Sequence, residues 1–299
     1  MRGGHGLSGD TAERRANRPR PPHTCPMLRT WIARSVPIVL AVVALSLAAP
    51  QAASAAPPVA TSTSVGNDVS WPQCGTRLPA STGFAIVGVN GGLANTWNPC
   101  FASQLAWAKS STPAGKVGAI GLYLNTANAA AQASWWPTGD VTKNGTAVTG
   151  NPYGSCVGPA NYNAACTFVY GYSFAVEDVA QVAGQGIAPS TYRWWLDVET
   201  GNTWQSSKAT NTASLEGMAA YLTQQGAQVG IYSTGYQWGV IAGTTPSTSN
   251  LYALPSWVAG FSSEKDARAK CSTVPPLTAG GRVSLTQYVL KQLDYNVAC

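Results

Sequence analysis

The sequence has little histidine, little charge and no long apolar run. Its 299 residues include two histidines, His5 and His23, and 10% charged residues. Both histidines precede residue 56, so residues 56–299 contain none. This lack excludes Ser-His-Asp and Cys-His catalysis, and zinc sites built on imidazole, from that part of the chain.

The longest apolar run, residues 36–49, is shorter than the roughly 18 residues that a membrane span needs. Arg29 and Arg34 precede it and Ala53-Ser54-Ala55 follows it, a pattern typical of a secretory signal peptide. We therefore predict that residues 1–55 are a signal peptide with an N-terminal extension, in which Met27 is an alternative start. The mature protein is expected to be exported and to have no stable membrane span.

The basic character of the chain comes from this leader. Residues 1–55 hold seven of the 18 Lys and Arg residues and two of the 12 Asp and Glu residues. Residues 56–299 keep 11 basic and 10 acidic residues, which is close to neutral. Nucleic-acid binding depends on neutralising phosphates, so we predict no nucleic-acid partner.

Six cysteines remain after the leader, which takes Cys25 with it. An even number in an exported chain predicts three disulfides, and we expect no catalytic thiol. The sequence allows 15 pairings, of which proximity favours the pairs 74–100, 156–166 and 271–299. The cysteines are Cys74, Cys100, Cys156, Cys166, Cys271 and Cys299.

Apolar runs alternate with helical patterns along residues 67–299, which we predict to be one domain after a flexible lead-in at 56–66. A helical face recurs over 168–183, with Glu177 and Asp178 on its polar side, and Gly226 is placed to end another helix. Further helices are predicted from Asn98 to Trp107 and around 215–222. Strand-like runs cover 84–89, 117–124, 192–198, 229–232, 256–259 and 285–289.

Repeated strand-then-helix units predict a parallel α/β sheet. Their number favours an irregular (β/α)8 barrel of the TIM type, with a doubly wound open sheet as the alternative. Residues 136–165 are rich in Gly, Asn and Pro and contain Cys156 and Cys166. We interpret them as a loop insertion closed by its own disulfide.

Without histidine, proton transfer near neutral pH depends on carboxyl groups. Six of the ten in residues 56–299 lie on helices, in a loop or in a charged stretch, where a structural role is expected. The other four each follow or close a strand-like run, where barrels bind ligands. These four are Asp68, Asp197, Glu199 and Asp294.

Asp197-Val198-Glu199 is the sharpest signal among them. Side chains at i and i+2 of a strand share one face, about 6.6 Å apart along it. Two carboxyl groups so close in a partly dry site raise one pKa, which supplies the proton donor and the anion needed to cleave a glycosidic bond. A calcium site or a capped strand end is the alternative.

Tryptophans lie near several strand ends, and Trp71 and Trp204 are nearest to the candidate carboxylates in sequence. Indole faces can stack on the C–H surface of a sugar. Tryptophans can equally fill the space between a barrel and its helices, so both roles stay open for each residue.

Five fragments, in order, resemble the family 25 glycoside hydrolases, the Chalaropsis-type lysozymes. Leu196-Asp197-Val198-Glu199 is similar to the D-x-E of their fourth strand. The other four fragments are Asp68-Val69-Ser70-Trp71-Pro72-Gln73, Gly230-Ile231-Tyr232-Ser233, Trp257-Val258-Ala259, and Gln287-Tyr288 followed by Asp294-Tyr295-Asn296.

This resemblance implies a β/α barrel that hydrolyses β-1,4 bonds in peptidoglycan or a related N-acetylated glycan, secreted or associated with the cell wall. By position, Glu199 would be the general acid. Asp197 would be its partner, stabilising an oxazolinium ion or a covalent intermediate. Substrate-binding positions would be Asp68, Asp294, Gln287 and Tyr288, the last two lining the floor, with Trp71 and Trp204 as stackers. No cofactor and no metal are implied.

The chain departs from the family pattern on two strands. It lacks the family's second-strand lysine, and Tyr123-Leu124-Asn125 stands where the family has Y-H-F. An inactive glycan-binding barrel is therefore the alternative function, and an envelope-structural protein without a ligand is a third possibility.

Overall fold

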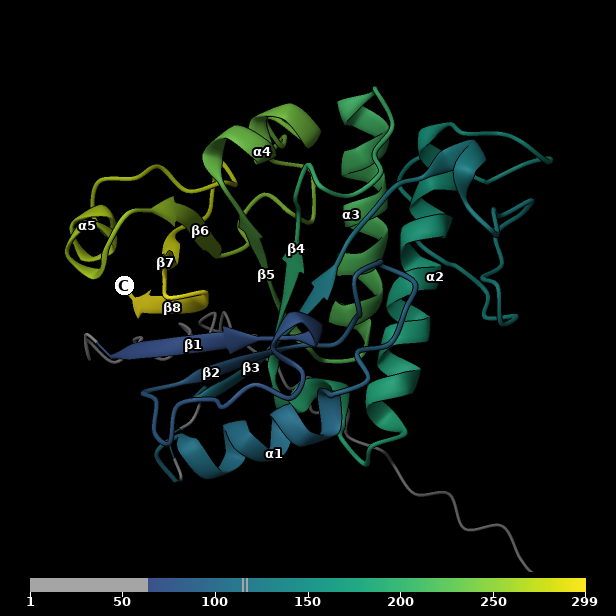
Figure 1. Cartoon of the computed structure of the whole chain (residues 1–299). Helices are drawn as coiled ribbons and strands as arrows, with labels where there is room; N and C mark the ends of the chain where they lie inside the picture. Colours follow the sequence, from purple (N-terminus) through teal and green to yellow (C-terminus); the bar gives the residue numbers. More distant parts are fainter. Residues whose placement is uncertain (1–63, 115, 117) are drawn as a thin grey trace, which may run out of the picture. The chain divides into compact units, whose positions relative to one another are not determined.

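The computed structural model describes residues 64–299 except 115 and 117. These residues form a closed barrel of eight strands in chain order (Figure 1). Strands β1 to β7 are parallel neighbours, and β8 closes the barrel by pairing antiparallel with both β7 and β1. The strands are β1 (Val65–Val69), β2 (Ala85–Gly88), β3 (Ile120–Asn125), β4 (Arg193–Asp197), β5 (Gln228–Ser233), β6 (Ser256–Phe261), β7 (Val283–Leu290) and β8 (Leu293–Ala298).

Helices and short 3-10 turns follow most of the parallel strands. The predicted irregular α/β barrel is confirmed, and the open-sheet alternative is wrong because every strand has two neighbours. The helices are α1 (Phe101–Ser111), α2 (Ala164–Ala183), α3 (Lys208–Gln224), α4 (Gly235–Ile241) and α5 (Glu264–Lys270), and the 3-10 turns are η1 (Trp71–Gln73), η2 (Ala130–Gln132) and η3 (Pro189–Thr191).

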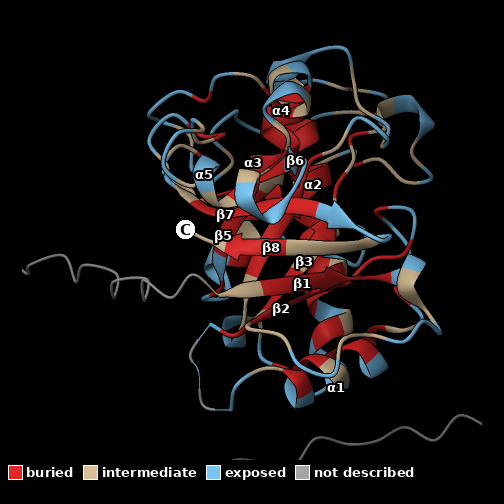
Figure 2. Cartoon of the chain, turned by 60° about the vertical axis from the view of Figure 1, so that its left-hand side comes forward, coloured by how far each residue is buried: buried red, intermediate tan, exposed pale blue. Residues whose placement is uncertain are grey.

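The alternation of side chains along each strand separates two cores. Figure 2 shows that most of the barrel strands are buried. On β4, Trp194 and Leu196 belong to the large apolar cluster that joins the strands to the helices. Trp195, between them, points the other way and packs with Trp257 and Ile86 inside the barrel. Strand residues two apart share a face, so Asp197 lies on the interior side with Trp195.

Helices α2 and α3 approach each other closely through two glycines. A Cβ atom on Gly171 would overlap the carbonyl oxygen of Ser214, and one on Gly217 would overlap that of Phe168. Only glycine therefore permits this backbone contact. Both helices contribute side chains to the large apolar cluster that also contains residues of β3, β4 and β5.

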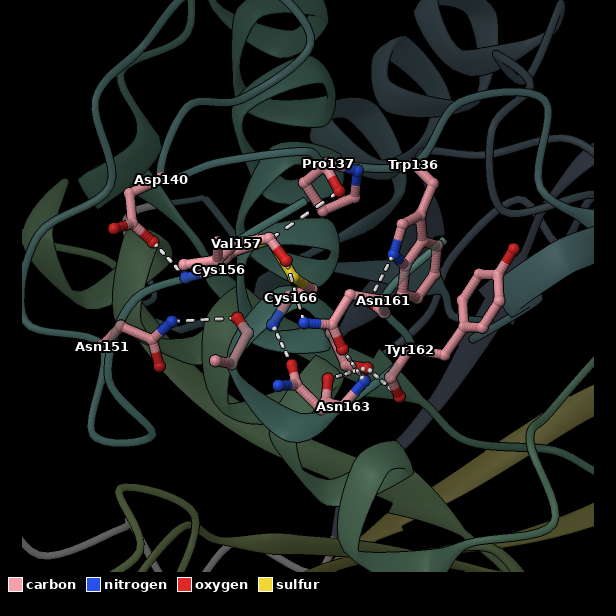
Figure 3. Close-up of a disulfide and its surroundings, with 12 residues drawn as sticks. Trp136, Pro137, Asp140, Asn151, Cys156, Val157, Asn161, Tyr162, Asn163 and Cys166 are labelled. Atoms are coloured by element: carbon pink, nitrogen blue, oxygen red, sulfur yellow. Dashed lines mark hydrogen bonds between the residues drawn. A yellow bond between two sulfur atoms is a disulfide. The ribbon is translucent and has the colours of Figure 1, made fainter. Parts of the chain in front are cut away.

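The three predicted disulfides are confirmed, with the pairings 74–100, 156–166 and 271–299. The Cys156–Cys166 bond ties the predicted insertion to the first turn of α2 (Figure 3). Around it, the Asp140 side chain accepts from the Cys156 backbone N–H at 2.8 Å, and the Asn151 amide donates to the Ala165 carbonyl at 2.9 Å.

Two details of the sequence analysis need correction. Strand β1 begins at Val65, inside the predicted lead-in of 56–66, because its first residues pair with β8. Asp178 is 3% exposed rather than on a solvated face, since α2 is covered on both sides. Its Oδ1 accepts from the Asn90 side chain at 2.8 Å.

The predicted signal peptide, residues 1–55, lies outside the described residues, as does all but the end of the lead-in. Within the part of the chain that is described, no helix is both long and apolar enough to cross a membrane.

Candidate active site

Four carboxyl groups gather at the carboxyl end of the parallel strands. Asp68 is on β1 and pairs in register with Asp294 on β8, which starts at this end because it runs antiparallel. Asp197 ends β4, and Glu199 follows it by two residues. After burial, the charge of Asp294 raises the pKa of Asp68, those of Glu199 and Asp68 raise the pKa of Asp197, and that of Glu199 raises the pKa of Asp294, so the four groups form one cluster. The structure thus brings together all four carboxylates predicted from the sequence.

Asp68 is held by a buried amide network. Its Oδ1 accepts from the side-chain amides of Gln287 at 3.0 Å and Asn296 at 2.6 Å. These amides are fixed in turn by the Tyr232 hydroxyl, which donates to Gln287, and by the Trp257 indole, which donates to Asn296, both at 2.8 Å. Burial, followed by the charge of Asp294, raises the pKa of Asp68 to about 7.

Asp197 has a buried carboxyl oxygen, Oδ1, without a hydrogen-bond partner among the described residues. The residue as a whole is 7% exposed. Burial, then the charges of Glu199 and Asp68, raise its pKa well above the ordinary value. A buried polar atom without a partner costs free energy, and a hydrogen bond from a bound group would offset that cost.

Glu199 lies in the loop after β4 and is half-buried. Its backbone carbonyl accepts from the Trp204 indole at 2.8 Å and from the Asn202 backbone N–H at 3.2 Å, which fixes the loop. Burial raises the pKa of its carboxyl group, and a hydrogen bond from Gln237 partly opposes that effect. A half-buried carboxyl group with a raised pKa can carry a proton and still reach a ligand.

Asp294 completes the cluster from the β8 side and is also half-buried. Burial, followed by the charge of Glu199, raises its pKa to about 6. The cluster therefore combines two deeply buried carboxyl groups, Asp68 and Asp197, with two that are half-buried, Glu199 and Asp294.

The two predicted tryptophans differ in their surroundings. Trp71 begins η1 directly after β1, is 48% exposed and lies beside Gly92. Trp204 packs against the large apolar cluster and holds the Glu199 backbone. Trp71 thus offers a free aromatic face, whereas Trp204 positions the loop that carries Glu199.

The placement predicted for Tyr288 is wrong. Gln287 and Tyr288 are adjacent in β7, so their side chains point to opposite faces. Gln287 faces the barrel interior, while Tyr288 stacks on Tyr295 with ring centroids 5.3 Å apart, and its hydroxyl donates to Glu264 of α5. Tyr288 supports α5 and does not line the floor of the site.

Several polar residues of the site were not predicted as such. Tyr123 and Tyr232 lie near the cluster: burial, followed by the charges of Asp68 and Asp197 among others, raises the pKa of both hydroxyls. Asn296 binds Asp68 directly. Tyr232 follows Gly230 by two residues, so both lie on the same face of β5. Gly230 lies against the Trp195 ring of the interior cluster, so this spacing could have indicated that Tyr232 also faces the interior.

The residues 64–299 that the structure describes contain no group of three or more His, Cys, Asp or Glu residues arranged to hold a metal ion. The hydrogen bonds of Asp68 to amide N–H groups also differ from a cation site, since amide donors point where a cation would bind.

Comparisons with known proteins give matches to lysozymes and lysozyme-like proteins. The family model described as "Lysozyme-like protein 1" matches residues 160–270. The probable GH family 25 lysozyme 2 of Dictyostelium discoideum is 31% identical over 94 residues, which are 31% of this chain and 41% of that protein. The matched segment thus spans less than half of that relative.

Two solved structures are similar at low identity. The bacterial lysozyme from Streptomyces coelicolor is 16% identical with a TM-score of 0.46, covering 79% of this chain and 92% of that one. The family GH25 lysozyme from Aspergillus fumigatus is 13% identical with a TM-score of 0.48, covering 80% and 94%. The segment that the family model matches includes β4 and Glu199. The family model and the Dictyostelium protein accord with the resemblance to family 25 lysozymes that the motifs indicate.

Proposed function

We propose that this chain is a glycoside hydrolase of the lysozyme type, which cleaves β-1,4 bonds in peptidoglycan or a related N-acetylated glycan. The observation that carries the proposal is the pair Asp197 and Glu199 at the end of β4, whose pKa values are raised by burial. Such a pair supplies a proton donor and a group that stabilises positive charge, the two requirements of glycosidic cleavage.

Glu199 is assigned the role of general acid. The raised pKa favours the protonated form of its carboxyl group, and its half-buried position lets it reach the glycosidic oxygen. As the bond to the leaving sugar breaks, the proton moves from Glu199 to that oxygen, and the sugar ring develops positive charge.

Asp197 is assigned the stabilisation of that charge. Burial makes its ionised form costly in the free protein, and a positive charge developing beside it offsets that cost. The unpartnered Oδ1 can interact with the acetamido group of the substrate, which would form an oxazolinium ion, or can bond to the anomeric carbon itself. Water then completes hydrolysis in either route.

Asp68, Asp294 and Gln287 are assigned to substrate binding around this pair. Gln287 donates a hydrogen bond to Asp68 and accepts one from the Tyr232 hydroxyl, which fixes both side chains, and Asp294 is half-buried. Trp71, with its exposed ring, is the preferred surface for stacking on a sugar.

The test is incubation of residues 56–299 with purified peptidoglycan, followed by a reducing-end assay and mass analysis of the products. Muropeptides with new reducing ends support the proposal. Saturable binding measured by calorimetry without new reducing ends would establish the glycan-binding alternative instead. Neither binding nor turnover would leave an envelope-structural role.

We further propose that the protein is secreted or associated with the cell wall. The leader pattern of residues 1–55 supports export, and the three disulfides suit an oxidising compartment. N-terminal sequencing of protein recovered from the culture medium should begin near Ala56. Retention of the leader on protein found inside the cells would contradict export.

A further inference from the structure

A cavity of about 280 Å³ lies among the connections that follow β2, β3 and β4. Its walls come from the segments after three successive strands: residues 92–95 after β2, residues in 127–135 after β3, and residues 201–203 after β4. One side of α2, from Tyr170 to Glu177, forms the back. These connections all leave the carboxyl ends of their strands, so the cavity lies at the same end of the barrel as the candidate active site.

The cavity and the cluster share a loop. Asn202 lines the cavity, and its backbone N–H donates to the Glu199 carbonyl at 3.2 Å. The Asn202 side chain also donates to Asn125, the β3 residue that pairs with Asp197 in the parallel ladder. A molecule in the cavity therefore lies next to the loop that positions both proposed catalytic groups.

The lining combines aromatic rings with side-chain amides. Trp135, Tyr170 and Phe174 give apolar walls, and Gln132 and Asn202 give donors and acceptors. Sugar rings have the matching chemistry, since their C–H faces contact aromatic rings while hydroxyl and acetamido groups bond to amides. The volume is just below the roughly 300–1,000 Å³ of pockets for drug-sized ligands, which suits a single sugar residue.

The wall after β3 is held rigidly in place. The Trp136 ring lies 4.5 Å from that of Tyr170 and 5.1 Å from that of Tyr162, and its indole N–H donates to the Asn161 carbonyl (Figure 3). The Cys156–Cys166 disulfide fixes the same segment to α2. Trp136 is thus committed to packing, while its neighbour Trp135 lines the cavity, which is formed before any ligand binds.

The charges of the lining favour a neutral occupant. Lys143 and Glu177 are its charged residues, and they pair with each other at 3.4 Å. A carboxylate of a peptide would have to compete with Glu177 for Lys143, whereas an uncharged sugar leaves the pair intact. This ion pair therefore favours an uncharged sugar over the acidic stem peptide of peptidoglycan as the occupant of the cavity.

We propose that this cavity, built by residues 127–135, the loop after β4 and α2, is a subsite for one uncharged N-acetylhexosamine unit of the glycan. The inference rests on the proposed function, because it names the part of the substrate that lies beside the cleaved bond. Residue Trp135 is its principal contact, and Gln132 and Asn202 bind the polar groups of the sugar.

The test measures binding without turnover. The Glu199→Gln variant, alone and combined with Trp135→Ala or Gln132→Ala, is titrated by calorimetry with tetrasaccharides of alternating N-acetylglucosamine and N-acetylmuramic acid, with and without stem peptides. Val157→Ala is the matched control, because Val157 is 69% exposed in the same insertion but does not line the cavity. Thermal melts verify that each variant is folded.

Trp135→Ala should weaken binding of both tetrasaccharides about tenfold, as loss of an aromatic contact does. Gln132→Ala, whose exposed side chain can be removed without disturbing the fold, should weaken both by a smaller factor, and Val157→Ala should have no effect. A loss confined to the peptide-bearing tetrasaccharide would overturn the inference in favour of a peptide site. Unchanged affinity in folded Trp135→Ala and Gln132→Ala variants would also overturn it.

A reducing-end assay on the variants with Glu199 intact separates this inference from the proposed function. Turnover by the wild-type chain with no change in KM for Trp135→Ala would overturn the subsite and leave the hydrolase proposal standing. Tetrasaccharide binding that depends on Trp135, without any turnover by the wild-type chain, would support the sugar site and contradict hydrolysis.

Discussion

At the scale of single residues, the four carboxyl groups of the site all have raised pKa values. Asp68, Asp197, Glu199 and Asp294 lie in one partly buried cluster, and burial is the largest influence on each pKa. Protons are therefore retained in the folded protein at pH values where isolated carboxyl groups have lost them. This retention has consequences both for catalysis and for stability.

Replacing Glu199 by Gln should abolish turnover with little effect on folding. The amide keeps the shape of the side chain but cannot donate a proton to the leaving oxygen, so kcat should fall by about 10²–10⁴-fold. Reducing-end release from peptidoglycan measures the loss, and a thermal melt measures stability. Glu264→Gln is the control, since Glu264 pairs with Arg268 on the exposed face of α5. An undiminished rate in Glu199→Gln would remove Glu199 from the acid role.

Replacing Asp68 by Asn should reduce the pH dependence of stability. The pKa values of Asp68 and Asp294 are raised to about 7 and about 6, so the folded chain binds more protons than the unfolded chain between about pH 4 and 7. Stability therefore falls as pH rises through this window. Asparagine keeps the oxygen that accepts from Gln287 and Asn296 but has no proton to lose.

Thermal melts of the Asp68→Asn variant between pH 4.5 and 8 should show a smaller decline in Tm than those of the wild-type chain. The expected difference is of the order of a few kcal/mol in unfolding free energy. Asp266→Asn on α5, outside the cluster, is the control and should follow the wild-type curve. Parallel curves for Asp68→Asn and wild type would show that Asp68 does not retain its proton.

The sequence could predict the four carboxylates because each one ends or follows an apolar strand, and barrel topology brings strand ends together. It could not predict that Tyr288 lies under α5, because that depends on which face of β7 Gln287 takes. The burial of Asp178 was equally hidden, since its neighbour Asn90 comes from a distant strand end.

At the scale of elements, the contact between α2 and α3 depends on two glycines. Replacing Gly171 by Ala should destabilise the protein, because the added methyl would overlap the carbonyl of Ser214 in the facing helix. The cost of such overpacking is about 1–3 kcal/mol. Chemical denaturation measures it as a lower midpoint.

Gly239→Ala in α4 is the matched control for this substitution. A Cβ atom there meets nothing within 4 Å, and alanine favours a helix over glycine by about 1 kcal/mol, so this variant should be slightly stabilised. Equal effects of the two substitutions would contradict the close approach of α2 and α3.

The sequence predicts where most helices and strands lie better than it predicts the residues at which they begin and end. Gly226 was expected to end a helix, and α3 does end just before it, with a φ of 76° at that glycine. Helix α1 begins at Phe101 and not directly after Asn98, because the Asn98 side chain accepts from the Cys100 backbone N–H and also binds the Gly88 carbonyl. Such end contacts involve partners that a local pattern does not reveal.

At the scale of the whole barrel, closure depends on β8. This strand pairs with β1 and β7 and contributes Asp294 and Asn296 to the site. Its antiparallel direction was not predicted, because six residues that alternate in polarity carry no information on strand order. The closed architecture was predictable from the repeated units, and the direction of the last strand was not.

Truncation after Gln292 should prevent formation of the folded barrel. Loss of β8 exposes the edges of β1 and β7 and removes two hydrogen-bonded polar groups from the interior. Circular dichroism should show no cooperative thermal transition. The Cys271→Ser, Cys299→Ser double variant is the control, since it keeps β8 and loses only the disulfide.

That double variant should still unfold cooperatively, with stability lower by about 3–4 kcal/mol, because without the cross-link the unfolded chain regains the conformational entropy of a loop of this length. A truncated chain that unfolds as sharply as the double variant would show that seven strands suffice for the fold.

The direction of β8 also decides where material attached to the chain would point. Because Val297 pairs with Val65 at the start of β1, residue 299 lies at the amino ends of the parallel strands, away from the carboxylates. A fluorescent label, affinity tag or solid support joined after Cys299 would therefore extend from the far end of the barrel and leave the mouth accessible to a large, insoluble polymer.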